Sequence, residues 1–168
     1  MNTPTEEQVQ IVDRQNRLTG VAPRSLMRRL ALTHRASFIL VFNASGELFL
    51  QKRTETKDIY PGYWDVAAGG VVMAGESYEE SAERELAEEL GITDIPLTVL
   101  FDHYYEDPEN RVWGRVFRCS HEGPFILQAE EVAYGRFIGI AEALRLSLSE
   151  PFTPDGVEIL RRIAGSEY

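Results

Sequence analysis

The sequence predicts an α+β sandwich, in which helices cover a mixed β-sheet. Two observations carry this prediction. Segments rich in β-branched and aromatic residues recur along most of the chain, and helical periodicity is confined to one central stretch, one terminal stretch and short connections. Many strands with few helices indicate a sheet packed against helices. At 168 residues with 43% hydrophobic content, the chain is expected to form one domain, residues 1–168.

The expected elements follow from local patterns along the chain. Residues 1–7 are expected to be frayed, and residues 8–22 predict two short strands with a turn near Asn16. Residues 23–32 predict a short basic helix or an irregular connection, and residues 37–53 read as a hairpin joined at "NASG". The later strands are expected at 63–72, 97–107, 111–119 and 134–140, with helices at 141–148 and 153–165.

The central helix has the clearest boundaries. Ser77 with Glu80 three residues later forms a capping box, which predicts that the helix begins at about Tyr78. Gly91 is expected to end it in a left-handed conformation. In the last helix, Thr153 is the predicted N-cap, followed by Pro154 at the first helical position. The stripe that packs the central helix on the sheet is expected to be Tyr78, Ala82, Leu86 and Leu90.

Composition excludes several classes of function. A net charge of −10 and a pI of about 4.8 argue against duplex nucleic acid or an anionic membrane as a partner, since both favour basic surfaces. Cys119 is the single cysteine, so no internal disulfide forms, and a buried position at a strand end is expected for it. The N-terminal segment lacks the pattern of a signal peptide, and no apolar run spans a bilayer. A cytoplasmic location is the resulting expectation.

The central helix carries an unusual cluster of like charge. Residues 76–89 contain seven glutamates, and Arg84, facing Glu80 and Glu88, is the one basic residue among them. Glu85, Glu88 and Glu89 share one edge of the helix, where like charges repel by roughly 0.2–0.5 kcal/mol per pair. A solvated charged face is one interpretation. A hard divalent cation such as Mg²⁺ explains the cluster better, because it prefers carboxylate oxygens and relieves the repulsion.

The spacing of these residues resembles a family signature. From Gly70 the chain runs five residues to Glu76, seven more to Arg84-Glu85-Leu86, one to Glu88-Glu89, and one to Gly91-Ile92. This stretch, residues 70–92, resembles the Nudix box without a departure. The resemblance implies the α/β/α sandwich of Nudix hydrolases. It also implies hydrolysis of a nucleoside diphosphate linked to another group, X, with Mg²⁺ or Mn²⁺ as the cofactor.

The resemblance also implies roles for individual residues. Glu85, Glu88 and Glu89 are expected to bind the metal, together with the carbonyl of Gly70. Glu88 and Glu89 are also expected to take part in catalysis, Glu88 as ligand or base. Arg84 is expected to orient the carboxylates through its planar guanidinium. Glu76 is expected to stabilise the loop and the start of the helix.

Two further sets of residues complete the expected site. In this family the base can instead lie on a later loop, where "QAEEV" offers Glu130 and Glu131, with Glu131 the better candidate and an exposed loop acid the alternative reading. Arg53 and Lys57 in "QKRTETK" match residues that hold a diphosphate in a related enzyme, and they are expected to bind substrate. Surface solubility is the alternative explanation for these two cations.

That related enzyme is type I isopentenyl-diphosphate isomerase, which shares the Nudix fold. The segment "HRASFILVFNASGELFLQKRTETKDIYPGYWD" is similar to it. Its catalytic cysteine falls at Gly69, and two of its three metal-binding histidines fall at Met27 and Val71, leaving His34. We therefore reject isomerase chemistry and interpret His34 as a structural histidine.

Two alternatives concern the protein as a whole. A Nudix-fold nucleotide sensor without turnover is the competing function, although such modules generally lose carboxylates from the box. Homodimerisation is common in the family and is compatible with this sequence. The identity of X does not follow from the sequence.

Overall fold

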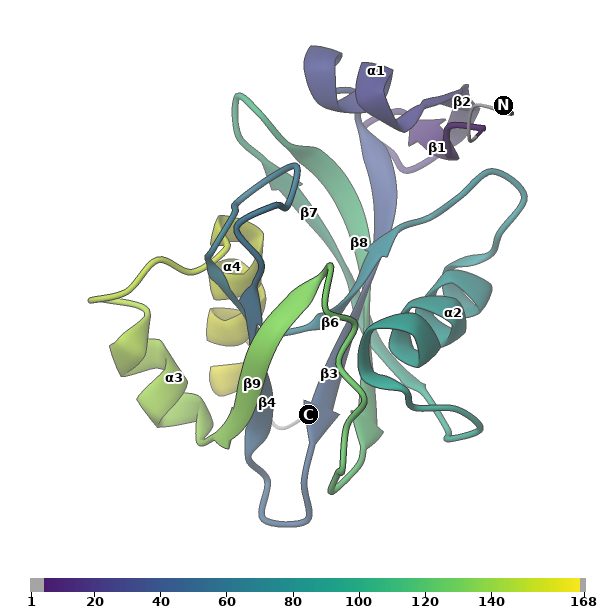
Figure 1. Ribbon diagram of the computed structural model, residues 1–168. Helices are drawn as coiled ribbons and strands as arrows, with labels where there is room; N and C mark the ends of the chain where they lie inside the picture. Colours follow the sequence, from purple (N-terminus) through teal and green to yellow (C-terminus); the bar gives the residue numbers. More distant parts are fainter. Residues whose placement is uncertain (1–4, 167–168) are drawn as a thin grey trace.

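A curled, mixed β-sheet forms the centre of the molecule, with helices on both of its faces (Figure 1). The computed structural model describes residues 5–166. Helix α2 covers one face, while α3 and α4 lie on the other. This arrangement confirms the predicted α+β sandwich.

Nine strands and four helices make up the described residues. The strands are β1 (Gln8–Val12), β2 (Leu18–Pro23), β3 (His34–Phe42), β4 (Leu48–Arg53), β5 (Trp64–Asp65), β6 (Ala68–Val71), β7 (Thr98–Glu106), β8 (Arg111–Ser120) and β9 (Val132–Ile138). The helices are α1 (Arg24–Leu30), α2 (Tyr78–Leu90), α3 (Ile140–Leu146) and α4 (Pro154–Ala164). No helix among residues 5–166 is long and apolar enough to cross a membrane.

Strand β3 organises the sheet. It pairs in parallel with β8 along its whole length and antiparallel with β6, and β7 extends the sheet beyond β8. Strand β4 pairs antiparallel with β9 and β5. The β1–β2 hairpin meets β3 at one end, where Ile11 lies opposite His34. Parallel and antiparallel pairs therefore occur in one sheet.

The predicted β3–β4 hairpin exists only at its turn. The two strands are paired at Phe42 and Leu48 and then separate, because β3 pairs with β8 and β4 pairs with β9. The strand expected at 63–72 is divided for the same reason: β5 stays beside β4, whereas β6 crosses to β3. The separation of β3 from β4 leaves room for a cavity bordered by β5 and β6.

Two apolar clusters hold the helices on the sheet. On one face, Leu86 and Leu90 of α2 pack against Ile39 and Phe117, in a cluster that also contains the buried Cys119. On the other face, Ile159 and Leu160 of α4 pack with residues of β3, β4 and β8. Burial of the two clusters fixes the ends of α2 and α4 relative to the centre of the sheet.

Helix α2 has the predicted boundaries. The Ser77 side chain accepts a hydrogen bond from Glu80 N, and the Glu80 carboxylate accepts one from Ser77 N. Gly91 ends the helix with φ of 68°. All four residues of the predicted stripe, Tyr78, Ala82, Leu86 and Leu90, are buried.

The N-terminal segment is partly ordered by α1. Residues 1–4 of the segment expected to be frayed lie outside the described residues. Glu6 accepts a hydrogen bond from Ser25 N at 2.7 Å, and Glu7 forms an ion pair with Arg24. Fraying therefore does not extend through Glu6 and Glu7.

Candidate active site

Glu89 is the most deeply buried carboxylate of the acidic helix, with 6% of the residue exposed. Its position in the last turn of α2 directs it at the end of β6, where its Oε2 accepts a hydrogen bond from Gly69 N at 3.0 Å. Burial raises the pKa of Glu89 well above its ordinary range, and the neighbouring Glu85 adds to the effect. Lys57 opposes this rise.

Glu85 lies one turn earlier and approaches the Gly70 backbone. A Cβ atom at Gly70 would lie only 2.7 Å from Glu85 Oε1, so a side chain there would compete with the carboxylate for space. Burial raises the pKa of Glu85 as well, and Glu88 and Glu131 raise it further, against the effect of Arg84. Glu85 and Glu89 are thus two carboxylates held where their charge is poorly solvated.

Arg84 connects the acidic residues into a network. Its Nε and Nη2 donate to the two oxygens of Glu76 at 2.7 and 3.0 Å. Its Nη1 donates to Glu85 at 2.8 Å and to Glu88 at 3.3 Å. Of the two expected partners, Glu88 is confirmed and Glu80 is wrong, because the Glu80 carboxylate is engaged in the capping box. These bonds raise the pKa of Arg84, which remains a fixed cation.

The fold brings Lys57 and Glu131 to the same place. Lys57 Nζ forms an ion pair with Glu131, although 74 residues separate them. Both line a small cavity with Arg53 and Glu89, so four residues predicted from separate parts of the sequence meet there. Glu130 is exposed, whereas Glu131 is half-buried.

Arg53 is largely engaged within the protein. It donates to Asp65 at 3.1 Å, to the Ile59 carbonyl at 2.8 Å and to the Tyr60 carbonyl at 3.2 Å. A guanidinium has five N–H donors, so three bonds leave two for a ligand. Arg53 therefore shapes the loop after β4 and still faces both cavities that border the site.

The donor set suits a hard divalent cation. Among the described residues, no three carboxylate, imidazole or thiol side chains already form a closed metal cage. Glu85 and Glu89 nevertheless lie against the Gly69–Gly70 backbone, with the exposed Glu88 on the same edge of α2, and the poor solvation of Glu85 and Glu89 is unfavourable without a nearby positive charge. Oxygen ligands of this kind are those that Mg²⁺ and Mn²⁺ prefer.

The structure also disfavours isomerase chemistry. Gly69 has φ of 134°, and a Cβ atom there would lie 1.9 Å from the Ser37 carbonyl oxygen, so no cysteine fits without a backbone shift. Met27 and Val71 pack with Val9 in a small apolar cluster where the isomerase has metal-binding histidines.

His34 is buried and neutral, in line with the structural role expected for it. Burial lowers its pKa to about 3, and the cations Arg28 and Arg24 contribute. Its Nδ1 lies 3.0 Å from the Leu32 carbonyl, which can only accept, so this nitrogen carries the proton.

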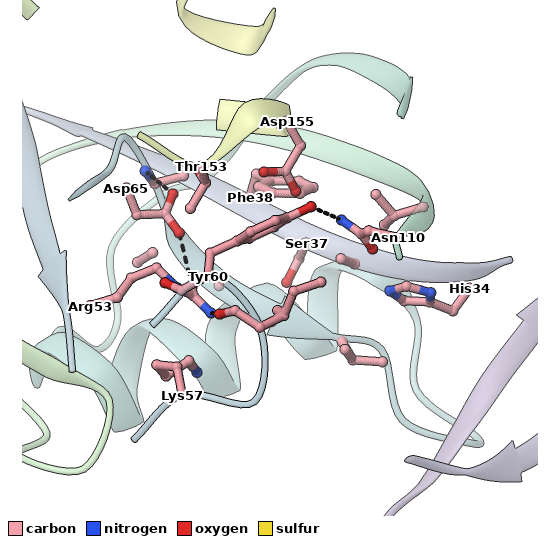
Figure 2. Close-up of a pocket in the computed structure, with 18 of the residues that line it drawn as sticks. His34, Ser37, Phe38, Arg53, Lys57, Tyr60, Asp65, Asn110, Thr153 and Asp155 are labelled. Carbon is pink, nitrogen blue, oxygen red and sulfur yellow. Dashed lines mark hydrogen bonds and ion pairs between the residues drawn. The ribbon is translucent and has the colours of Figure 1, made fainter. Parts of the chain in front are cut away.

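A second cavity lies beyond the Gly69–Gly70 backbone and encloses about 70 Å³ (Figure 2). Sequence reasoning missed the polar residues of its wall, which are Tyr60, Asp65, Asn110, Thr153 and Asp155. They come from three loops, from strand β5, which contains Asp65, and from the first turn of α4. Their convergence results from tertiary structure alone.

Asp155 is the charged residue buried in this wall. Burial and the nearby Asp65 raise its pKa to about 7, while a hydrogen bond from Gly156 N and the charge of Arg53 act in the opposite direction. A carboxyl group with this pKa exchanges its proton near neutral pH.

The sequence matches the NUDIX domain family over residues 32–163. It is 48% identical over 150 residues to an uncharacterized Nudix hydrolase of Pseudomonas aeruginosa, PA4841, covering 89% of each chain. It is 43% identical over 154 residues to the uncharacterized Nudix hydrolase YfcD of Escherichia coli K12, covering 92% of this chain and 84% of YfcD.

Two solved structures are similar. DR0079 from Deinococcus radiodurans has a TM-score of 0.82 at 24% identity, covering 93% of this chain and 98% of that one. A MutT protein from Methanosarcina mazei Go1 has a TM-score of 0.70 at 25% identity, covering 79% of this chain and 94% of that one.

Proposed function

The chain belongs to the Nudix family and is a hydrolase of phosphorus-containing anhydrides. We propose that it cleaves the diphosphate linkage of a nucleoside diphosphate joined to a group X, and that the reaction depends on a divalent metal ion. The observation that carries the proposal is that the buried Glu89 and the half-buried Glu85 lie against the Gly69–Gly70 backbone, with Lys57 beside Glu89. Two poorly solvated carboxylates next to a cavity indicate a cation site, and a diphosphate needs a cation to screen its charge.

We propose that Glu85, Glu88, Glu89 and the Gly70 carbonyl hold Mg²⁺, with Mn²⁺ as the alternative ion. When bound, the cation screens the diphosphate and lowers the pKa of water. Arg84 is a positioning residue in this scheme, since its bonds to Glu76, Glu85 and Glu88 set the carboxylate directions.

Two carboxylates are candidates for the base that takes a proton from the attacking water. Glu88 is exposed on α2, and Arg84 donates a hydrogen bond to its carboxylate at 3.3 Å. The carboxylate is therefore held in place and still accessible to a water molecule. Glu131 approaches from the loop before β9 and is held by Lys57. Separate Glu88→Gln and Glu131→Gln variants decide between them, since loss of the base lowers kcat by roughly 10²–10⁴-fold.

Lys57 and Arg53 are the proposed phosphate contacts. Lys57 faces the same cavity as Glu89 and exchanges its partner Glu131 for a phosphate oxygen when substrate enters. Arg53 uses the two N–H groups that remain outside its internal bonds. The buried Gln51 amide, whose Nε2 lacks a partner among the described residues, lines the same cavity and adds a neutral donor.

The test is hydrolysis of a substrate panel by purified protein. The panel contains nucleoside di- and triphosphates, ADP-ribose, NADH, FAD, coenzyme A and dinucleoside polyphosphates, each with Mg²⁺, Mn²⁺ or chelator. Glu89→Gln is compared with Glu83→Gln, which removes an exposed carboxylate from the same helix. We expect metal-dependent turnover that is lost in Glu89→Gln and retained in Glu83→Gln.

Turnover in chelator, or full activity of Glu89→Gln, would contradict the proposed mechanism. Tight nucleotide binding without turnover of any compound would favour the sensor function instead. The complete set of box carboxylates argues against that second outcome.

A further inference from the structure

The 70 Å³ cavity beyond the Gly69–Gly70 backbone is placed to receive the part of the substrate that is not a phosphate. Gly69 and Gly70 separate it from Glu89 and Glu85, and Lys57 borders both this cavity and the smaller one that holds Glu89. In Figure 2, Asp65, Thr153 and Asp155 gather on one side of the Tyr60 ring and Lys57 lies on the other. A group attached to a diphosphate at the metal site would enter here.

Asn110 presents an unpaired acceptor to this cavity. Only 4% of the residue is exposed, and its Oδ1 has no hydrogen-bond partner among the described residues. The Tyr60 hydroxyl donates to Asp107 at 3.0 Å, so its oxygen accepts from Asn110 Nδ2 at 3.2 Å. This chain of bonds fixes the amide orientation and leaves the carbonyl oxygen free.

Thr153 presents a second unpaired atom. It is the N-cap residue of α4 and only 2% exposed, yet its hydroxyl makes no capping bond. The Gly156 N–H, which a capping hydroxyl normally binds, donates instead to Asp155 Oδ1 at 2.9 Å. Thr153 Oγ1 is therefore buried in the cavity wall without a partner among the described residues.

The rest of this wall also accepts hydrogen bonds. With the proton of His34 on Nδ1, its Nε2 is an acceptor. The cations of the rim each have a carboxylate partner: Asp58 and Glu7 for Arg24, and Asp58 for Arg28. Arg53, which pairs with Asp65, keeps two N–H donors, so the cavity also offers donors to a ligand hydroxyl. Buried acceptors without donors are unfavourable and rare in folded proteins, so a ligand that brings donors would relieve them.

The size of the cavity limits the ligand further. Water needs about 10–15 Å³ of such volume, so 70 Å³ accommodates roughly five non-hydrogen atoms. A purine base is larger than this part of the cavity and would project from its open side. An alkyl chain of the right size would leave Asn110 Oδ1 and Thr153 Oγ1 unpaired, and an ionised second phosphate, which has no donors, would leave Asn110 Oδ1 unpaired.

We propose that this cavity binds a compact polyhydroxy group X, about the size of glycerol, whose hydroxyl groups donate to Asn110 Oδ1 and hydrogen-bond with Thr153 Oγ1. The inference rests on the proposed function, in which the diphosphate that carries X lies at Glu85 and Glu89. It narrows the substrate class to nucleoside diphosphates esterified with a short polyol.

The test uses three matched esters of ADP and of CDP, carrying 1-propyl, glyceryl or 3-aminopropyl groups. All three share the diphosphate bond that is cleaved, so differences in kcat/KM report binding of X. We expect kcat/KM for the glyceryl ester to exceed that for the propyl ester by at least about tenfold, because the propyl group leaves buried acceptors unpaired.

Variants assign this preference to the cavity. Thr153→Val removes the hydroxyl at nearly constant volume and is expected to lower the glyceryl-to-propyl ratio by at least about fivefold, whereas Thr153→Ser keeps the hydroxyl and the ratio. Thr98→Val, on the exposed start of β7, is the matched control and is expected to leave the ratio unchanged.

The outcomes separate the two proposals. Equal turnover of the glyceryl and propyl esters, or preference for the aminopropyl ester, overturns the polyol inference and leaves the hydrolase intact. A glyceryl preference that Thr153→Val does not reduce also overturns it. Absence of metal-dependent hydrolysis of every ester and of the whole panel overturns the proposed function, and the polyol inference with it.

Discussion

At the scale of single residues, the candidate site depends on polar atoms that the fold buries without full compensation. Glu89 accepts a hydrogen bond from Gly69 N in a fully buried position, and Thr153 Oγ1 has no partner within residues 5–166. Such atoms reduce stability and are retained where a ligand uses them. Stability and function therefore oppose each other at these positions.

Thr153 allows this opposition to be measured. We expect Thr153→Val to increase the free energy of unfolding by about 1 kcal/mol, because the variant removes a buried hydroxyl that lacks a partner. Chemical denaturation of wild type, Thr153→Val and Thr98→Val provides the comparison. A loss of stability in Thr153→Val alone would show that its hydroxyl is satisfied in solution.

Gly69 is a second position where a single added atom is expected to change the stability of the protein. We expect Gly69→Ala to lower the free energy of unfolding by at least about 2 kcal/mol more than Gly46→Ala, since the new Cβ would lie 1.9 Å from a backbone oxygen. Gly46 is the matched control, with φ of 77° and no atom within 4 Å of the added Cβ. Similar losses in the two variants, measured by denaturation, would refute the steric argument.

At the scale of elements, α2 carries the acidic residues and its N-terminal cap fixes where they point. We expect Ser77→Ala to reduce stability by about 1 kcal/mol, because the Glu80 N–H loses its side-chain acceptor. Ser77→Asp keeps an acceptor and is expected to remain close to wild type. Thermal unfolding of the three proteins tests this, and equal melting temperatures would contradict it.

Asp155, in the first turn of α4, makes the stability of the protein depend on pH. Asp155 faces Asp65, Arg53, Tyr60 and Tyr105, and its pKa of about 7 lies above the ordinary value of 3.8. The folded state therefore holds this proton more tightly than the unfolded state. Its contribution to stability is present below pH 4 and is lost as the pH rises to about 7.

Asp155→Asn isolates this contribution, because asparagine stays neutral. We expect the variant to match wild type near pH 4 and to become more stable than wild type as the pH rises, by on the order of 4 kcal/mol above pH 7. Chemical denaturation across this range measures the difference between the two proteins. A difference that is constant with pH would refute the assignment of this pKa.

At the scale of the whole molecule, the net charge is −10, and several of the negatively charged residues surround the proposed cation site. A ligand that binds the folded state alone raises its stability by mass action. We expect Mg²⁺ at ten times its Kd to add about 1.4 kcal/mol, or about 4 °C in Tm.

This shift is expected to disappear in Glu89→Gln and to persist in Glu83→Gln, measured by thermal unfolding with Mg²⁺ or with chelator. The readout does not require turnover, so it tests the metal site separately from the substrate. Equal Mg²⁺ effects in the two variants would place the ion elsewhere on the acidic surface.

Much of the fold followed from local sequence signals. The boundaries of α2 were predictable because the capping box, Gly91 and the stripe are all short-range features of consecutive residues. The paired course of β3 and β4 was wrong beyond the turn, because strand pairing depends on segments far along the chain. Local propensity describes a strand and leaves its partner undetermined.

The family, the acidic edge of α2 and the absence of the isomerase residues could be read from the sequence, because they depend on which residue stands at each position of a known spacing. Three features required the folded structure: the contact of Lys57 with Glu131, the three hydrogen bonds that Arg53 donates within the protein, and the cavity lined by Asn110, Thr153 and Asp155. These residues come from strands, loops and a helix that are far apart in the sequence, and burial of the two apolar clusters sets the distances between them.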